Sequence, residues 1–200
     1  WTTADLCGTG GDGSGSFNIS SAASIVAAAC GLRVAKHGNR SVSSRCGSAD
    51  VFEALGVSLS AGPEVLAQCL AHAGIAFLFA PSMHPATRNV VSVRRELGVR
   101  TAFNLLGPLT NPTRPAHQIV GVPRPELTEL LARALSLLGS RRAWVVHGAD
   151  GLDELSTTGY SKVSECRDGA VKTCYVHPSA VGLPQAPAAA LAGGDAAARA

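Results

Sequence analysis

Two polar segments that contain glycine hold the side chains best suited to bind a charged ligand. Gly8–Gly13 and Lys36–Ser44 each follow a short apolar stretch that is typical of a β-strand. Glycine allows positive φ and lets backbone N–H groups approach a ligand closely. A helix that begins after such a loop adds the positive end of its dipole. We therefore expect the two loops to hold an anion of the phosphate or pyrophosphate kind, with Lys36 and Arg40 as further positive charge.

The first loop matches neither of two common phosphate-binding patterns. It lacks the lysine of a G-x-x-x-x-G-K-[ST] loop, and its spacing is not that of G-x-G-x-x-G. We interpret Gly8–Gly13 as a pyrophosphate cradle in which Asp12 faces a sugar or a metal ion. A tight turn that needs glycine for its backbone conformation is the alternative interpretation.

The second loop is unusually polar for a segment that follows an apolar strand. Its charged and polar cluster comprises Lys36, His37, Asn39 and Arg40. A solvated surface loop is the alternative, since loops normally lie on the surface. The hydroxyl groups of Ser43, Ser44 and Ser48 are suited to hydrogen-bond phosphate oxygens, whereas Asp50 is placed to cap the helix that follows.

A carboxylate pair and an arginine on a helix are further candidates. Asp153 and Glu154 follow a predicted strand, and Mg²⁺ is commonly held by one or two carboxylates together with substrate phosphates. N-capping or solvent exposure is the alternative for this pair. Arg88, Arg94 and Arg95 lie on a helix predicted over Pro85–Leu97, and one arginine there is suited to bind a substrate carboxylate through two hydrogen bonds. A solvated helix face is the alternative for that arginine.

The composition excludes several other classes of protein. The chain has 200 residues, of which 46% are hydrophobic, enough for one domain with a packed core. A net charge of +3 is weaker than the basic excess of most nucleic-acid-binding domains. No apolar run is long enough to span a membrane. The six cysteines form no C-x-x-C pair, which favours reduced thiols in a cytoplasmic protein.

The order of predicted elements favours an α/β fold. The predicted strands are one that ends at Cys7 and four over 32–35, 75–80, 118–122 and 142–147, with two extended pieces in 163–176. The predicted helices are a buried one over 22–30 and others over 49–55, 63–73, 85–97 and 125–138, with a loop over 105–115. This alternation predicts a largely parallel sheet flanked by helices, with ligands at the carboxyl ends of the strands. We assign residues 1–177 to one α/β catalytic domain and residues 178–200 to an Ala/Pro/Gly-rich C-terminal segment.

A set of motifs, in matching order from about Asp5 to Glu165, resembles the anthranilate phosphoribosyltransferase family. The motifs are Gly8–Asp12, Phe17–Ser21, Lys36–Arg40 with Val42–Ser44, Gly47–Asp50, Phe79–Pro81 with His84–Pro85, Val93–Gly98, Arg100–Thr101, Phe103–Asn104, Leu106–Leu109 with Asn111–Pro112, and Asp153–Ser156. Several motifs together are far more specific than any single one. The resemblance implies a catalytic domain like those of nucleoside phosphorylases and phosphoribosyltransferases. Ser16 and Ser21 stand where threonine is common in this family, and both keep a hydroxyl group.

The resemblance also implies a reaction and a set of binding residues. Anthranilate and phosphoribosyl pyrophosphate would give N-(5-phosphoribosyl)anthranilate and pyrophosphate in tryptophan biosynthesis, with Mg²⁺ as cofactor. The residues that it implies for the phosphoribosyl donor are Gly8, Gly11, Asp12, Ser16, Asn18, Ile19, Ser20, Ser21, Lys36, His37, Gly38, Asn39, Arg40, Ser41, Val42, Ser43, Ser44 and Ser48. Those that it implies for anthranilate are Gly8, Asn39 and Arg94 with His37 nearby, and those for magnesium are Ser20, Asp153 and Glu154.

The family further implies a small N-terminal helical domain, mostly absent from this chain, and a homodimer formed through it. Two other functions are left open by the residues. One is a pyrimidine nucleoside phosphorylase of the same fold class, which the pair Asn39–Arg40 disfavours. The other is a non-catalytic relative that binds nucleic acid through a basic groove, which the modest charge and the Asp153–Glu154 pair disfavour. We expect neither a membrane nor nucleic acid as a partner.

Overall fold

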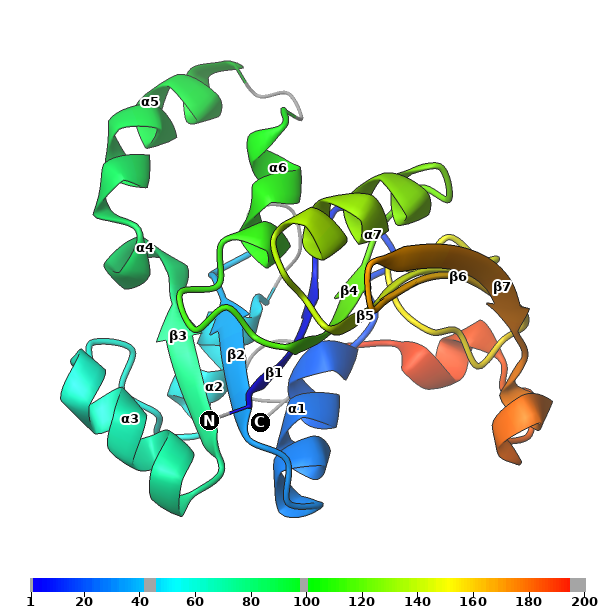
Figure 1. Cartoon of the computed structure of the whole chain (residues 1–200), viewed down its shortest axis with the longest axis horizontal. Helices are drawn as coiled ribbons and strands as arrows, with labels where there is room; N and C mark the ends of the chain where they lie inside the picture. The colour runs from blue at the N-terminus through cyan, green and yellow to red at the C-terminus, as the bar shows by residue number, and fades with distance from the viewer. Residues whose placement is uncertain (1, 42–45, 98–100, 195–200) are drawn as a thin grey trace.

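The computed structural model describes residues 2–41, 46–97 and 101–194. Within Arg88–Leu97 it describes the backbone throughout, but the side chains of residues 89, 90, 93, 96 and 97 only. This part of the chain forms a seven-stranded sheet with helices on both faces (Figure 1). The strands are β1 Ala4–Gly8, β2 Val34–Gly38, β3 Ile75–Phe79, β4 His117–Gly121, β5 Arg142–Gly148, β6 Ser161–Arg167 and β7 Ala170–Val176. The helices are α1 Ile19–Ala29, α2 Ser48–Ala54, α3 Pro63–His72, α4 Ala80–Met83, α5 Arg88–Leu97, α6 Phe103–Leu106 and α7 Leu127–Leu137. The 3₁₀ turns are η1 Pro85–Thr87, η2 Gly107–Leu109, η3 Pro178–Val181 and η4 Ala188–Leu191.

The strand order is β3-β2-β1-β4-β5-β6-β7. Strands β3 to β5 pair in parallel, whereas β5, β6 and β7 pair antiparallel through a hairpin. The predicted α/β fold with a largely parallel sheet is therefore confirmed. The chain order reverses at β1, which lies between β2 and β4, and open α/β sheets bind ligands at such a switch point. The loops after β1, β2 and β5 all leave the sheet at this carboxyl edge.

Side chains alternate between the two faces of the sheet and so divide the core. On one face, Leu131 and Leu135 of α7 pack against Val120 and Val145. Toward β3 the same face carries a second cluster, in which Leu66 and Leu70 of α3 pack against Ala35, Ala76 and Leu78. On the opposite face, the rings of Phe52 on α2 and Phe77 on β3 stack 4.7 Å apart. Helix α1 lies on this second face, over β1 and β2.

Helix α1 differs from its prediction as a buried helix. Its buried residues are Ser21 and Ser24, whereas Ile25 and Val26 are exposed by 42% and 62%. Small side chains allow a helix to approach a sheet closely, and Ser24 Oγ is satisfied because it donates to the Ser20 carbonyl oxygen at 2.6 Å. The apolar composition of this segment therefore does not identify the face that contacts the sheet.

The loop predicted over 105–115 contains two short helical turns, α6 and η2. Pro108 lies in the first turn of η2, where a missing N–H costs no hydrogen bond. The predicted helix over 85–97 likewise divides into η1 and α5. Among the described residues, no helix combines the length and the apolar character needed to cross a membrane.

Candidate active site

The glycine loop (residues 9–18) and the carboxylate loop (residues 149–160) meet across the end of β4. The N–H group of Gly10 donates to Asp153 Oδ2 at 2.8 Å, and Asp153 N–H donates to Asp12 Oδ2 at 3.5 Å. A Cβ atom on Gly121 would lie 1.5 Å from the carbonyl oxygen of Asp153, and a Cβ atom on Gly8 would lie 2.6 Å from Asp153 Oδ2. Glycine at these two strand ends is thus what allows the carboxylate loop to cross them so closely.

The carboxyl groups of Asp12, Asp153 and Glu154 gather at this meeting point, and those of Asp153 and Glu154 have raised pKa values. Burial, followed by the charge of Asp12, raises the pKa of Asp153 to about 7. Burial, followed by the charge of Asp153, raises the pKa of Glu154 to about 8. The assignment of Asp153 and Glu154 to a cation site stays a prediction. Perturbed carboxyl groups in one place are typical of functional sites.

The donor set fits Mg²⁺. Asp153 and Glu154 supply hard carboxylate oxygens, and Ser20 lines the same cavity of about 100 Å³ as Glu154, between α1 and β1. Within the described ranges, no group of three or more His, Cys, Asp or Glu side chains is placed so that it could hold a metal ion as a cage of protein ligands. Mg²⁺ rarely needs such a cage, because it usually keeps several waters and takes further oxygens from substrate phosphates.

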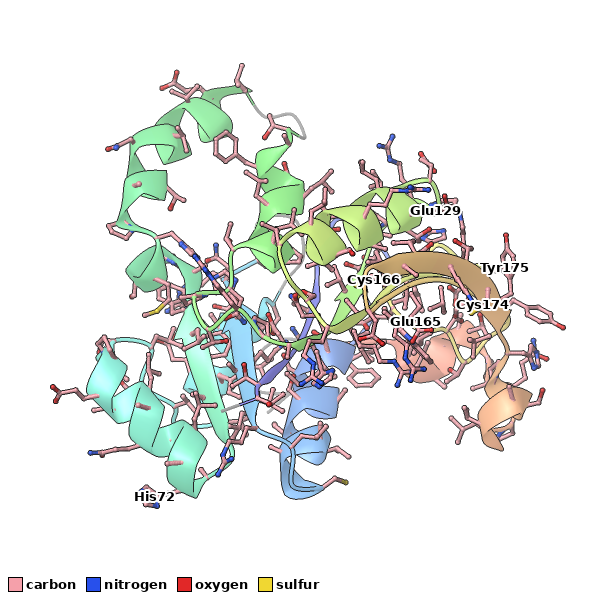
Figure 2. The ribbon with its side chains drawn as sticks, in the orientation of Figure 1. His72, Glu129, Glu165, Cys166, Cys174 and Tyr175 are labelled. Atoms are coloured by element: carbon pink, nitrogen blue, oxygen red, sulfur yellow. The ribbon has the colours of Figure 1, made fainter. Side chains whose placement is uncertain are left out.

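A carboxylate outside this site shows the contrast. Glu165 on β6, labelled in Figure 2, accepts hydrogen bonds from Arg142 Nε at 2.6 Å and Trp144 Nε1 at 3.0 Å. The Trp144 hydrogen bond and then the Arg142 partner lower the pKa of Glu165, although burial opposes them. Glu165 is therefore a paired structural carboxylate, whereas the Asp153 region concentrates like charges.

Asp150 organises the carboxylate loop, a role that sequence reasoning missed. Its Oδ2 accepts from Ser156 Oγ and Thr158 Oγ1, both at 2.6 Å, and its Oδ1 accepts from Leu152 N–H at 3.2 Å. The hydroxyl hydrogen bonds outweigh burial and lower the pKa of Asp150, because they favour the charged form. The signal available in the sequence was the run of Asp, Ser and Thr between residues 150 and 158, which is typical of side chains that bind nearby backbone.

Lys36 lies beneath the site rather than on its surface. Its side chain is 1% exposed, and its Nζ donates to the Leu6 carbonyl oxygen and, at 3.2 Å, to Ser20 Oγ. Burial lowers the pKa of this amine, an effect that the nearby Asp5, Cys7 and Glu154 oppose. Lys36 thus places its charge next to the first turn of α1, where no acidic residue is present. The N-terminus of α1 and Lys36 together make this corner positive.

Arg40 lies on the second loop but is already paired. Its Nη1 lies 2.6 Å from Asp50 Oδ1 and 2.9 Å from Glu53 Oε2, both on α2. Asp50 also accepts from Gly47 N–H at 2.7 Å, so its predicted role as a helix cap is confirmed. The sequence predicted Arg40 as further positive charge for the ligand, and in this structure two carboxylates of α2 already offset that charge.

The rest of the second loop is partly described. Ser48 Oγ donates to the Asn39 carbonyl oxygen at 3.3 Å, so the start of α2 and Asn39 lie together. The predicted residues Val42, Ser43 and Ser44 lie outside the described residues. Arg94 is placed on the backbone of α5, and its side chain likewise lies outside the described part.

His37 joins three elements at the end of β2. Its backbone N–H donates to Asp5 Oδ1 at 3.2 Å, its Nδ1 lies 3.2 Å from the Gly107 carbonyl oxygen, and its Nε2 lies 3.0 Å from His84 Nε2. Since a carbonyl oxygen only accepts, Nδ1 carries the proton, and Nε2 accepts from His84. Burial and then the neighbouring His84 lower the pKa of His37 to about 4. His84, which stands in the motif His84–Pro85, is thus part of this region.

Fold and site together define a class: an α/β domain in which a glycine loop, a carboxylate loop and a buried lysine meet at the switch point of a largely parallel sheet. The chain matches the glycosyl transferase family, a/b domain, over residues 2–200, and it belongs to that family. The expectation drawn from the sequence motifs is confirmed at this level.

Individual relatives point to one branch of the family. The chain is 58% identical over 192 residues to an anthranilate phosphoribosyltransferase of Moorella thermoacetica, with 96% of this chain and 57% of the relative covered. The crystal structure of anthranilate phosphoribosyltransferase from Thermus thermophilus matches with a TM-score of 0.91 and 50% identity, covering 98% of this chain and 58% of that one. The Saccharomyces cerevisiae enzyme in complex with PRPP and Mg matches with a TM-score of 0.88 and 33% identity, covering 98% and 54%. The chain therefore spans a little over half the length of these relatives.

Proposed function

We propose that this protein transfers the phosphoribosyl group from phosphoribosyl pyrophosphate to anthranilate, which releases pyrophosphate. The observation that carries the proposal is the meeting of the glycine loop and the carboxylate loop at the β1–β4 switch point, beside Lys36 and Ser20. A diphosphate needs backbone N–H donors, positive charge and a cation. This arrangement supplies the first two and carboxylate oxygens suited to hold the third. The similarity to enzymes named for this reaction supports the same assignment.

The donor's phosphate groups are the ligands that we assign to the glycine loop and the start of α1. The proposed contacts are those of Gly8, Gly11, Asp12, Ser16, Asn18, Ile19, Ser20 and Ser21, with Lys36 to Ser44 and Ser48 on the second loop. Lys36 acts through its charge and through Ser20, because its amine is buried. Arg40 positions the second loop through Asp50 and Glu53, and binding of a phosphate would have to compete with those carboxylates.

Mg²⁺ is the cofactor that we propose, held by Ser20, Asp153 and Glu154. When bound, it supplies positive charge that stabilises the pyrophosphate leaving group. The chain's own residues supply the remainder: Asp153 is fixed by Gly10 N–H, and Asp150 fixes the loop that carries it. The yeast structures with Mg, at about a third identity or less, support the assignment of this ion.

Anthranilate is the acceptor that we propose, positioned by Gly8, Asn39 and Arg94, with His37 nearby. An aromatic amine is a free nucleophile at neutral pH, so the site needs orientation more than a strong general base. Preorganised donors toward the leaving group then lower the barrier. The yeast enzyme in complex with 4-fluoroanthranilate supports an aromatic acid in this position. A homodimer and a cytoplasmic location stay predictions for the whole protein.

The test is a fluorescence assay of anthranilate consumption with phosphoribosyl pyrophosphate and MgCl₂. The full-length protein and this chain alone are assayed side by side. Loss of anthranilate fluorescence that requires both donor and Mg²⁺ would support the proposal. A folded full-length protein that leaves anthranilate unchanged would contradict it. Phosphorolysis of thymidine would instead indicate the nucleoside phosphorylase, and steeply salt-dependent DNA binding would indicate the nucleic-acid-binding relative.

The magnesium assignment has its own test in the double variant Asp153→Asn with Glu154→Gln. Both substitutions keep the side-chain volume but remove the anionic oxygens that Mg²⁺ prefers. We expect the Mg²⁺ concentration for half-maximal activity to rise about tenfold or more. The matched control is Glu64→Gln with Asp168→Asn, two exposed carboxylates away from the site. An Mg²⁺ titration that is the same in both doubles would remove Asp153 and Glu154 from the cation site.

A further inference from the structure

A segment near the end of the described chain contacts the glycine loop through backbone hydrogen bonds. The N–H group of Phe17 donates to the Leu191 carbonyl oxygen at 2.9 Å, and Gly193 N–H donates to the Gly15 carbonyl oxygen at 2.9 Å. Between these two bonds, Ser16 and Ala192 form an antiparallel bridge. The chain from 191 to 193 thus pairs with the point at which the glycine loop enters α1.

The same segment contacts the carboxylate loop a few residues earlier. Ala186 N–H donates to the Thr157 carbonyl oxygen at 2.9 Å, and Gln185 Nε2 donates to the Thr158 carbonyl oxygen. Residues 178–194 appear in orange to red in Figure 1, with their red part between α1 and the yellow loops beside β5 and β6. A single stretch, 185–193, therefore binds both loops of the candidate site.

Contacts inside the carboxylate loop connect this stretch to the proposed cation ligands. Thr158 Oγ1 donates to Asp150 Oδ2 at 2.6 Å, and Asp150 Oδ1 accepts from Leu152 N–H at 3.2 Å. Leu152 immediately precedes Asp153, whose Oδ2 accepts from Gly10 N–H at 2.8 Å. The glycine loop, the carboxylate loop and residues 185–193 therefore form a closed ring in which each segment is hydrogen-bonded to the other two.

We propose that residues 185–193 are a positioning strap that fixes the glycine loop relative to Asp153 and Glu154. The strap sets how well the site is preorganised for the diphosphate of the donor and its cation, and this inference rests on the proposed function. Nearly all of its contacts use backbone groups, so a sequence rich in Ala, Pro and Gly is compatible with the role. Pro187 stiffens the strap between its two sets of contacts, because its ring fixes φ.

The test removes one backbone donor from the strap in the full-length protein. Gly193→Pro deletes the N–H group that binds Gly15, and the preceding Ala192 has φ −59° and ψ 133°, which suits a residue before proline. Gly193→Ala keeps the N–H group and is the matched control. Ala188→Pro is a second control, because it places proline at the first position of η4 after Pro187 with ψ 147°. Gln185→Ala removes, through an exposed side chain, one of the two hydrogen bonds between the strap and the carboxylate loop.

The readout is KM for phosphoribosyl pyrophosphate compared with KM for anthranilate. A purely structural role would not change the first without the second. We expect Gly193→Pro to raise KM for phosphoribosyl pyrophosphate about three- to tenfold, the equivalent of one lost hydrogen bond, with KM for anthranilate little changed. Gln185→Ala should shift it in the same direction, and the two controls should match the parent. A donor KM that is equal in Gly193→Pro and Gly193→Ala would overturn the proposal, and if Gly193→Pro fails to fold, an unchanged Gln185→Ala would do so.

Hydrogen exchange separates failure of the strap from failure of the proposed function. Amides in residues 8–17 and 149–158 should exchange faster in Gly193→Pro than in Gly193→Ala, whether or not the protein is active. Unchanged exchange in both loops would overturn the strap. An inactive parent whose two loops nevertheless loosen in Gly193→Pro would support the strap as a positioning element and reject only the proposed reaction.

Discussion

His37 carries the clearest pH signature at the scale of a single residue. Its ring lies between the Gly107 carbonyl oxygen and His84, and the side chain is 5% exposed. Burial and the neighbouring His84 lower its pKa from an ordinary value of 6.5 to about 4. A protonated His37 would present two N–H groups and lose its hydrogen bond from His84. The neutral ring is therefore part of what holds β2 against the segment around His84.

This lowered pKa predicts how stability depends on pH. A base with a depressed folded pKa contributes stability that is present above pH 6.5 and is lost as the pH falls toward 4. Between pH 7.5 and pH 4, the parent should lose about 3 kcal/mol more unfolding free energy than His37→Gln, which does not titrate. Urea unfolding of both proteins at several pH values measures this difference. Parallel pH profiles would show that the buried imidazole does not titrate in this way.

At the scale of the elements, the parallel strands deliver loops to one edge, and small residues let those loops cross. Strand β4 ends at Gly121, directly beneath the backbone of Asp153. The loop after β5 reaches the loop after β1 only because no side chain stands on β4 at that point. The spacing of the carboxylates from the glycine loop is thus set by the width of one strand.

The prediction for this element is that Gly121→Ala displaces the carboxylate loop. Its Cβ atom would lie 1.5 Å from the Asp153 carbonyl oxygen, a backbone atom that has to move. We expect the unfolding free energy to fall by about 1–3 kcal/mol. We expect the catalytic rate to fall by more than the loss of folded protein accounts for. Gly159→Ala is the control, because a Cβ atom there meets nothing within 4 Å. Thermal unfolding and steady-state rates for both variants measure the effect, and equal behaviour of the two would contradict this account of the strand end.

At the scale of the whole molecule, a buried polar link joins the neighbouring strands β1 and β2 to a loop distant in the sequence. Asn111 Nδ2 donates to Asp5 Oδ2 and to the Ala35 carbonyl oxygen, both at 2.8 Å. Asp5 is fully buried, and burial raises its pKa despite the nearby Lys36. Asn111 therefore ties β1 and β2 to the segment before β4, and it satisfies acceptors that water does not reach.

Removal of this link should destabilise the whole domain. Asn111→Ala leaves Asp5 Oδ2 and the Ala35 carbonyl oxygen without their shared donor in a buried place. We expect a loss of about 2–4 kcal/mol of unfolding free energy, measured by urea denaturation at pH 7. Thr110→Ala, a neighbouring change at an exposed residue, is the control and should cost less than about 1 kcal/mol. A small, equal effect of both substitutions would show that Asn111 is not a structural centre.

The sequence by itself determined the fold class and the order of most elements, and it indicated the loops to which we assign the ligands. Its alternation of apolar strands and amphipathic helices is a local property, as is the glycine content of Gly8–Gly13. The motifs that resemble one enzyme family are also contiguous segments of the sequence, so they can be recognised without the structure. The Asp153–Glu154 pair was recognised because adjacent carboxylates after a strand are visible without any contact. How the chain divides at residue 177 stays a prediction.

Only the tertiary structure decided which groups meet. His37 pairs with His84, Arg40 with Asp50 and Glu53, and Asn111 with Asp5, over sequence separations of 10 to 106 residues. Separations of this size leave no local pattern in the sequence. The serine face of α1 was missed because hydrophobicity alone does not show how closely a helix approaches a sheet. The role of residues 185–193 was missed for a related reason: backbone hydrogen bonds leave no trace in side-chain types, so a strap reads as low-complexity sequence.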